Sequence, residues 1–283
     1  MVIEISSDSR IDINHHFRVS AGPGAGKTHW LSLHVSHVLK DSESLGKMGK
    51  VACLSYTNVG ADTLMGRMYE DRSRVLSCTI HSFLYAYIVK PYLHFIATDE
   101  GFNIELLNGE DDRILSDYNT FEEIRKAVKQ YYAEQDATFT AIRAAKWKLQ
   151  EDGSLKCYAN PPKKCCKKGY ALNENAYVVY KKLAWKKGYM HYDDVLYFSY
   201  KLIQKYPYIS RTLAIQFPYV FIDEFQDTNP IQAKIIKSLG ENGAIVGVIG
   251  DYAQSIYGFL GADPNQFASF TLDGLLDYTI LDN

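Results

Sequence analysis

The chain has 283 residues, of which 47% are hydrophobic and 23% are charged, and its formal net charge at pH 7 is -2. This composition supplies a substantial core and excludes an intrinsically disordered protein, while the charge alone neither favours nor excludes a nucleic-acid partner. No stretch reaches the roughly 18 apolar residues of a membrane span, and the beginning of the chain lacks a secretory pattern. Five irregularly spaced cysteines fit a reducing compartment. We therefore expect a cytoplasmic protein with no membrane partner.

Short apolar runs alternate with helical patterns at the beginning of the chain, and the same alternation returns near its end. The predicted strands are residues 17–20, 51–55, 75–78, 219–222 and 244–249. Helical patterns follow the first two strands, at residues 28–39 and 61–68. Strands separated by helices of this length predict right-handed βαβ units, and hence an α/β fold with a parallel sheet and helices on both faces.

The middle of the chain, residues 86–204, differs in being rich in Tyr and Lys and mostly helical in pattern. We interpret it as a helical, basic subdomain inserted into a core made of residues 1–85 and 205–283. Between Arg143 and Lys187 there are 12 Lys or Arg and 3 Asp or Glu. The tyrosines interleaved with them are Tyr158, Tyr170, Tyr177 and Tyr180. Such a segment suits a groove for a nucleic-acid backbone, and a solvated helical face is the alternative.

A glycine-rich segment lies between the first predicted strand and the helical pattern after it. Its residues are Ala21, Gly22, Pro23, Gly24, Ala25, Gly26, Lys27 and Thr28, which fit the P-loop pattern with Ala in place of the first Gly. Small residues let successive backbone N–H groups surround a phosphate at the N-terminus of the following helix. We expect Lys27 to reach the β- and γ-phosphates and the Thr28 hydroxyl to ligate Mg²⁺.

Acidic and amide side chains follow two of the later strands. Asp223 and Glu224 come directly after the strand at 219–222, and Gln254 follows the strand at 244–249. The carboxyl ends of parallel strands are where open α/β sheets bind ligands. Asp223 can hold the metal ion, and Glu224 can take a proton from an attacking water. Gln254 can sense the γ-phosphate, so that together with the P-loop these residues predict a hydrolytic nucleotide site.

Five motifs in order resemble the UvrD/Rep/PcrA group of superfamily 1A DNA helicases. They are Ala-Gly-Pro-Gly-Ala-Gly-Lys-Thr (21–28), Ser-Tyr-Thr-Asn (55–58), Thr-Ile-His-Ser-Phe (79–83), Asp-Glu-Phe-Gln-Asp-Thr-Asn (223–229) and Gly-Asp-Tyr-Ala-Gln-Ser-Ile-Tyr-Gly-Phe-Leu-Gly-Ala (250–262). The resemblance implies a RecA-like domain that hydrolyses ATP with Mg²⁺ and contacts single-stranded or partly duplex DNA. By position it assigns the nucleotide and catalytic roles to Lys27, Thr28, Asp223, Glu224 and Gln254.

The resemblance also implies which residues line the DNA path: Thr57, Asn58, His81, Tyr257 and Phe259. Aromatic rings such as those of Tyr257 and Phe259 would offer faces on which bases stack without sequence preference. The alternative for these two residues is packing in the core. For His81 the alternative is a residue at a helix start that is hydrogen-bonded to the backbone.

Three departures from the family pattern shape the functional hypotheses. No glutamine occurs in residues 1–29 to read adenine, Leu260 replaces a usual arginine, and the second RecA-like domain with its arginines is absent from these residues. One hypothesis is therefore a fragment of a helicase subunit that binds nucleotide, hydrolyses it slowly alone and works with a second helicase domain. The alternative is a nucleotide-responsive DNA-sensing subunit that regulates a partner nuclease. A small P-loop kinase is disfavoured by Gln-Asp-Thr-Asn and Gln-Ser-Ile-Tyr.

Overall fold

The computed structural model describes residues 2–67, 72–252 and 265–281. The chain divides into two compact units, each treated by itself below. The first unit comprises Met1–Tyr87 and Ile203–Asn283, and the second comprises Ile88–Leu202. In the described part of the chain, no helix has both the length and the apolar character needed to cross a membrane.

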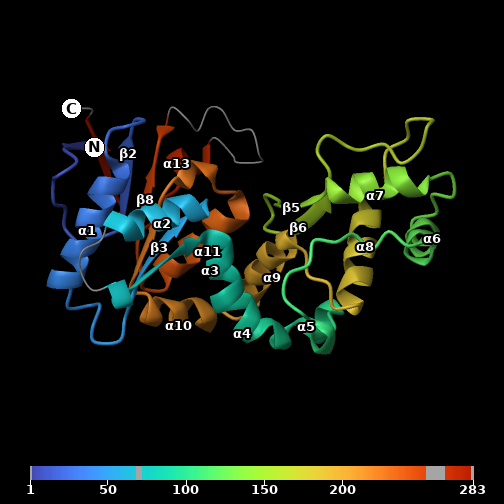
Figure 1. Cartoon of the computed structure of the whole chain (residues 1–283), viewed down its shortest axis with the longest axis horizontal. Helices are drawn as coiled ribbons and strands as arrows, with labels where there is room; N and C mark the ends of the chain where they lie inside the picture. The colour runs from blue at the N-terminus through green and yellow to red at the C-terminus, as the bar shows by residue number, and fades with distance from the viewer. Residues whose placement is uncertain (1, 68–71, 253–264, 282–283) are drawn as a thin grey trace. The chain divides into compact units, whose positions relative to one another are not determined.

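The first unit is built on a seven-stranded sheet in the order β1-β9-β2-β8-β7-β3-β4, in which every pairing is parallel (Figure 1). Its strands are β1 (Val2–Ile5), β2 (Phe17–Ala21), β3 (Val51–Ser55), β4 (Val75–Thr79), β7 (Tyr219–Ile222), β8 (Ile245–Gly250) and β9 (Leu276–Ile280). All five predicted strands are present, and the prediction of a parallel α/β sheet is confirmed. Because the strands run in one direction, their carboxyl ends meet along one edge.

Two further strands, β1 and β9, extend the sheet beyond β2, and neither has the sequence pattern of a buried strand. β1 lies at the sheet edge with Val2 58% and Ile3 43% exposed, so its side chains do not form an apolar run facing the core. β9 mixes polar and apolar residues. Its pairing with β2 is reinforced by Arg18, whose Nε lies 2.6 Å from Oδ1 of Asp277. Each of these two strands can be identified only from its pairing with a strand that is distant in the sequence.

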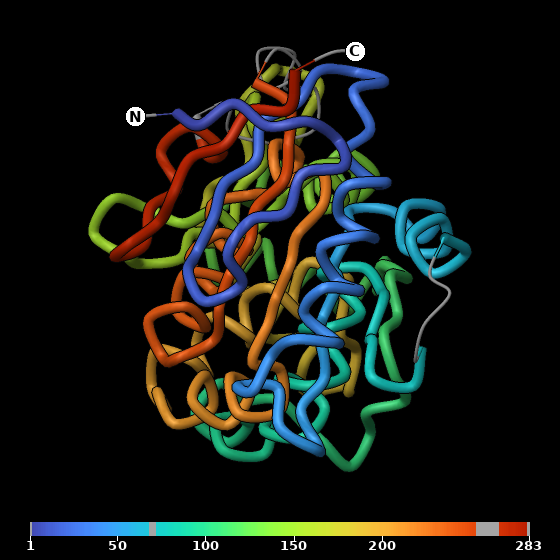
Figure 2. Tube along the Cα trace, turned by 90° about the vertical axis from the view of Figure 1, so that its left-hand side faces the viewer, coloured from blue at the N-terminus to red at the C-terminus, as the bar shows by residue number. Residues whose placement is uncertain are grey.

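Helices cover both faces of the sheet. Those of the first unit are α1 (Lys27–Asp41), α2 (Asn58–Arg67), α3 (Ile80–Leu84), α10 (Tyr208–Gln216), α11 (Pro230–Glu241) and α13 (Asn265–Ser269). On one face, α1 and α2 bury Trp30, Val35 and Leu64 against Phe17 and Phe221 of the strands. The backbone tube in Figure 2 shows α1 lying along the strands. On the other face, α11 packs against β8 and α10 packs against α11. The core therefore lies in two layers, one on each side of the sheet.

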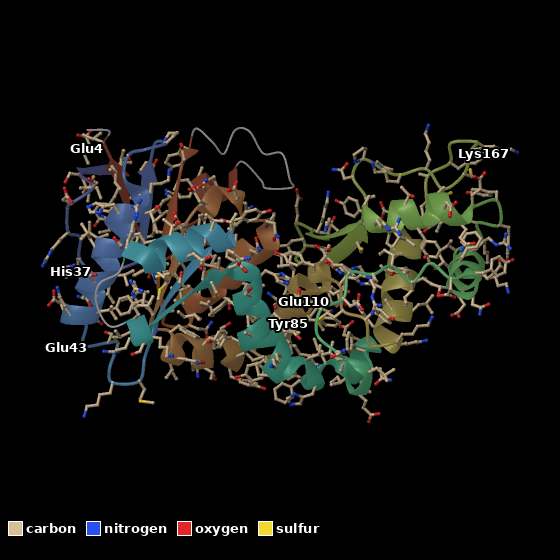
Figure 3. The ribbon with its side chains drawn as sticks, viewed as in Figure 1. Glu4, His37, Glu43, Tyr85, Glu110 and Lys167 are labelled. Carbon is tan, nitrogen blue, oxygen red and sulfur yellow. The ribbon has the colours of Figure 1, made fainter. Side chains whose placement is uncertain are left out.

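The second unit is mostly helical. Its helices are α4 (Lys90–Tyr92), α5 (Ala97–Glu100), α6 (Tyr118–Ala127), α7 (Gln135–Arg143), α8 (Glu174–Lys186) and most of α9 (Tyr192–Lys205). It also contains an antiparallel hairpin of β5 (Lys146–Leu149) and β6 (Leu155–Tyr158), which the helical pattern does not predict. Lys167, in the segment between β6 and α8, extends into solvent (Figure 3).

The basic, tyrosine-rich segment of this unit is only partly a surface. Tyr177 and Tyr180 are 2% and 1% exposed, so the prediction that they line a nucleic-acid groove is wrong. They lie three residues apart on α8, which places both rings on the face that packs into the core. Lys181 is buried as well, with its Nζ 2.7 Å from Oδ1 of Asp194. Tyr170 is 55% exposed and can still serve such a surface.

Candidate functional site

The glycine-rich loop joins β2 to α1. Gly24 and Gly26 have φ angles of 81° and 87°, in the left-handed region that glycine adopts without strain. Gly26 is the N-cap of α1, and no side chain caps that helix end in the described structure. The helix has no acidic residue in its first turn. Its first N–H groups, together with the positive end of the helix dipole, therefore favour an anion.

Lys27 is the first residue of α1 and is only 9% exposed. Its Nζ donates to the backbone oxygens of Ala21 and Gly22, at 3.2 and 3.3 Å. These hydrogen bonds hold the ammonium within the loop, where a phosphate oxygen would be a stronger, charge-assisted acceptor. Thr28 follows it and is half-buried.

Asp223 lies at the carboxyl end of β7 and is 8% exposed. Its N–H donates to the Leu54 oxygen at 2.8 Å, which continues the pairing of β7 with β3. Burial and the neighbouring Glu224 carboxylate raise the pKa of Asp223 to about 6, while the positive charge of Lys27 opposes this rise. Lys27 follows β2 and Asp223 ends β7, and only β8 lies between these two parallel strands, so both residues stand at the carboxyl edge of the sheet.

Glu224 has a φ of 52° and a ψ of 44°, a left-handed conformation that is uncommon for residues other than glycine. Its N–H donates to Oδ1 of Asp223 at 3.0 Å. Its carboxylate accepts from Nε2 of Gln226 at 2.6 Å. Strained backbone of this kind clusters at functional sites. Gln226 has no predicted role of its own, although its place two residues after Glu224 in the quoted motif was a usable signal.

The carboxyl end of β8 reaches the same residues. The Asp251 N–H donates to Oε1 of Gln226 at 3.1 Å, so Gln226 is bonded to both strand ends. Four residues discussed above in this region lie outside the described residues: Gln254, Tyr257, Phe259 and Leu260. The phosphate-sensing role of Gln254 and the DNA contacts of the two aromatic residues stay predictions.

The three remaining predicted DNA residues follow the ends of β3 and β4. Thr57 and Asn58 are exposed at the start of α2. Tyr56 and Val59, which carry no predicted role, are 43% and 75% exposed beside them. His81 is buried, 5% exposed, in the short helix α3 after β4. Thr57 and Asn58 are therefore exposed at the carboxyl edge of the sheet, whereas His81 is buried.

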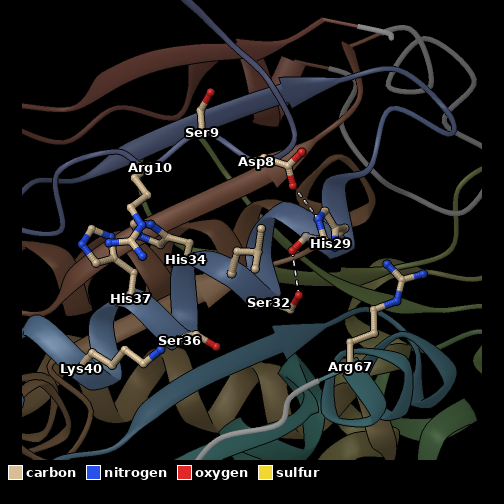
Figure 4. Close-up of a pocket in the computed structure, with 11 residues that line it drawn as sticks. Asp8, Ser9, Arg10, His29, Ser32, His34, Ser36, His37, Lys40 and Arg67 are labelled. Carbon is tan, nitrogen blue, oxygen red and sulfur yellow. Dashed lines mark hydrogen bonds and ion pairs between the residues drawn. The ribbon is translucent and has the colours of Figure 1, made fainter.

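A pocket of about 650 Å³ runs along α1 from the residue after the P-loop (Figure 4). Its lining residues are Asp8, Ser9, Arg10, His29, Ser32, Leu33, His34, Ser36, His37, Lys40 and Arg67. At the end nearest the loop, Nε2 of His29 lies 2.9 Å from Oδ1 of Asp8. Three basic side chains, Arg10, Lys40 and Arg67, against the single carboxylate of Asp8 make the pocket suited to an anionic ligand.

Comparison with known proteins gives a consistent assignment. Residues 7–273 match the model of the UvrD/REP helicase N-terminal domain. The chain is 26% identical over 278 residues to the ATP-dependent DNA helicase srs2 of Schizosaccharomyces pombe, covering 92% of this chain and 30% of that protein. It is 24% identical over 270 residues to the ATP-dependent DNA helicase PcrA of Leuconostoc citreum, covering 93% and 34% of the two chains.

PcrA of Staphylococcus aureus is similar at 25% identity over 260 residues, covering 90% of this chain and 34% of that one. The chain thus spans about a third of the length of the curated relatives that it matches. The family match extends over both compact units, and the strand-end residues described above fall inside it. The chain therefore belongs to the UvrD/REP helicase N-terminal domain family.

Proposed function

We propose that this chain is the nucleotide-binding, ATP-hydrolysing part of a DNA helicase or translocase that acts on single-stranded DNA. The observation that carries the proposal is the placement of two buried side chains at the carboxyl edge of one parallel sheet: Lys27 after β2 and Asp223 after β7, with β8 between the two strands. A lysine-bearing loop and a buried carboxylate can together hold a triphosphate with its metal ion. Membership of the family and the names of the relatives support the same function.

The donors at the sheet edge fit Mg²⁺, which prefers oxygen ligands. Asp223 is a buried carboxylate beside the negative charge of Glu224, so a cation next to it would relieve the cost of its ionisation. Thr28 supplies a hydroxyl next to the loop lysine. We propose that these two residues hold the ion, and that the bound ion neutralises charge on the phosphates.

The remaining steps fall to residues of the chain itself. The loop amides at the N-terminus of α1 bind the phosphates, and Lys27 exchanges its two carbonyl partners for phosphate oxygens. Glu224 orients the attacking water and accepts its proton. Gln254 responds to the γ-phosphate. The nucleoside end is directed toward the pocket along α1, which Asp8, Ser9 and His29 help to line.

The proposed DNA contacts are Thr57 and Asn58, together with His81, Tyr257 and Phe259. Thr57 and Asn58 are exposed at the same sheet edge as the nucleotide residues, and this supports a DNA strand passing near the hydrolytic site. The basic segment of the second unit offers additional phosphate contacts. We further propose that fast hydrolysis needs an arginine from a second helicase domain or a partner protein, because such arginines are worth about 10³–10⁵ in rate.

The test measures ATP turnover by this chain with and without single-stranded DNA, and then with a second helicase domain added as a separate protein. The proposal predicts Mg²⁺-dependent nucleotide binding, slow turnover alone, and stimulation by DNA once the second domain is present. Stimulation of an associated nuclease in place of strand separation would instead favour the DNA-sensing subunit. A chain that binds no nucleotide in the presence of Mg²⁺ would refute both functions.

A further inference from the structure

The Gln226 side chain lies between two strand ends at the proposed hydrolytic site. It is 2% exposed and belongs to the short turn Phe225–Asp227 after β7. Its Nε2 donates to Oε2 of Glu224 at 2.6 Å, and its Oε1 accepts from the Asp251 N–H at 3.1 Å. One amide therefore connects the carboxylate after β7 to the backbone after β8.

Only an amide in one orientation satisfies both neighbours. A carboxylate only accepts hydrogen bonds and a backbone N–H only donates them. The Gln226 nitrogen must therefore face Glu224 and its oxygen must face Asp251. A carboxylate at position 226 could keep the hydrogen bond from Asp251 but would repel Glu224, and an apolar side chain could make neither hydrogen bond.

Close packing fixes the oxygen end of this amide. A Cβ added at Gly250, the last residue of β8, would lie 2.6 Å from Oε1 of Gln226 and 3.1 Å from the Phe267 ring. Both approaches are closer than real Cβ atoms make without movement of the neighbour. The missing side chain of Gly250 thus makes room for the amide beside β8.

The nitrogen end of the amide binds Glu224, a residue whose backbone conformation is strained. Glu224 has a φ of 52°, where a residue with a Cβ is disfavoured. In the described part of the chain, Gln226 is the side chain that donates a hydrogen bond to the Glu224 carboxylate. Binding one oxygen, Oε2, leaves the other carboxylate oxygen available to a water molecule.

We propose that Gln226 is a positioning residue that orients the Glu224 carboxylate for hydrolysis and joins it to the carboxyl end of β8. This inference rests on the proposed function, because it assigns Glu224 the role of general base. Asp251 stands three residues before Gln254, the predicted γ-phosphate sensor, in the sequence. A displacement of the Glu224 carboxylate would therefore be passed through one amide to the backbone at Asp251.

The first experiment compares Gln226→Met and Gln226→Glu with Gln232→Met in single-turnover hydrolysis and in binding of a fluorescent nucleotide. Gln232 is the matched control, since it is a buried glutamine of the same unit that caps α11 and makes no contact with Glu224 in the described structure. We expect both Gln226 variants to lower the rate constant about 10- to 100-fold while nucleotide affinity changes less than about twofold. Gln232→Met should lower the melting temperature and leave the rate constant unchanged.

Two further variants test whether Gln226 acts through Glu224. Gly250→Ala displaces the amide without changing it and should lower the rate constant as Gln226→Met does. In a Glu224→Gln background, Gln226→Met should cause no additional loss, because residues that act as a unit are not additive. Full rates in Gln226→Met, or equal additional losses with and without Glu224, would overturn the proposal.

Hydrogen exchange at the Asp251 amide tests the join independently of activity. The account predicts protection in the wild type and in Gln226→Glu, and loss of protection in Gln226→Met. Equal protection in all three would refute the connection to β8 even if hydrolysis were normal. The opposite outcome is also distinguishable. If the wild-type chain shows this exchange pattern but neither binds nor hydrolyses nucleotide, the proposed function is refuted, and so is the catalytic role of the amide.

Discussion

Of the buried carboxylates in the described part of the chain, Asp194 in the second unit and Asp223 in the first have opposite environments. Asp194 in the second unit is fully buried, and its oxygens accept from the indole N–H groups of Trp147 and Trp185 at 3.0 and 2.9 Å. Nζ of Lys181 lies at 2.7 Å, and both the backbone N–H and the ring of His191 are within 3.2 Å. Burial opposes ionisation of Asp194, but Lys181 and His191 more than offset it and lower its pKa.

Asp223 in the first unit is almost as deeply buried but has few compensating donors. It accepts from the Glu224 N–H at 3.0 Å, and the Glu224 carboxylate adds a second negative charge next to it. Burial and this charge raise the pKa of Asp223 to about 6. We infer from this difference that the hydrogen bonds and ion pair of Asp194 stabilise the fold of the second unit. Ionised Asp223, in contrast, has an electrostatic free-energy cost that a bound cation would remove.

The largest effect predicted from this comparison is on hydrolysis. Glu224→Gln keeps the shape of the side chain but removes the proton acceptor beside Asp223. We expect the single-turnover rate constant to fall about 10²–10⁴-fold, with nucleotide affinity retained. Asp227→Asn, which changes a nearby carboxylate in the same turn, is the control and should retain most activity. An unchanged rate in Glu224→Gln would remove the general base from the account.

The next effect is on the stability of the second unit. Lys181→Met leaves Asp194 buried without its cation and should lower the free energy of unfolding by about 3–5 kcal/mol. Lys182→Met changes the exposed neighbour on the same helix and should alter it by less than about 0.5 kcal/mol. Denaturant titration followed by the fluorescence of Trp147 and Trp185 checks both variants. Equal stability of the two variants would show that the network around Asp194 is not structural.

A stabilising substitution is predicted at Asp223, the buried carboxylate of the first unit. The pKa of Asp223 is about 6 in the folded chain against an ordinary value of 3.8, so its ionisation opposes folding as pH rises through this window. Asp223→Asn should raise the stability of the nucleotide-free protein in EDTA at pH 8 by up to about 3 kcal/mol. The difference should vanish below about pH 3, where Asp223 is protonated in both states. Thermal melts across this range provide the measurement, and a destabilised variant at pH 8 would contradict the assignment.

The smallest predicted effect concerns DNA. Lys167 and Lys168 are exposed in the basic segment, so replacing both with Gln should weaken binding of single-stranded DNA by a few-fold. The dependence of log K on log salt should become shallower by roughly 0.7 for each DNA phosphate that the variant no longer neutralises. Lys47→Gln with Lys50→Gln, two exposed lysines of the first unit, is the matched control. Equal weakening in both double variants would indicate that overall charge, and not this segment, governs binding.

Local patterns predicted the strands that are buried in the centre of the sheet. β3 and β7 read as apolar runs because both of their faces are covered, and the P-loop was recognisable from its small residues. β1 and β9 escaped prediction because they pair with each other from opposite ends of the chain. Their short, partly exposed sequences carry no periodic signal that a local reading could use.

Prediction of the site residues was limited for the same reason, because some of their contacts join residues that are distant in the sequence. The Lys-Thr pair and the Asp-Glu pair were predictable because each stands at a strand end in a recognisable pattern. The partnership of Gln226 with Asp251 joins two different strand ends, so no spacing along the chain reveals it. Lys181 and Tyr180 looked like parts of a basic aromatic surface, but their burial depends on the position of Asp194 and on the packing of α8.

The most direct test of the central claim is calorimetric titration of a non-hydrolysable ATP analogue with Mg²⁺ into the wild type, Lys27→Ala, Asp223→Asn and the double variant. The account predicts saturable binding that weakens about 100-fold or more in Lys27→Ala. It also predicts dependence on Mg²⁺ in the wild type but not in Asp223→Asn, and a loss of binding free energy in the double variant smaller than the sum of the single losses. Undiminished, Mg²⁺-dependent binding by Lys27→Ala, or strictly additive losses, would contradict a single site shared by the loop and the strand end.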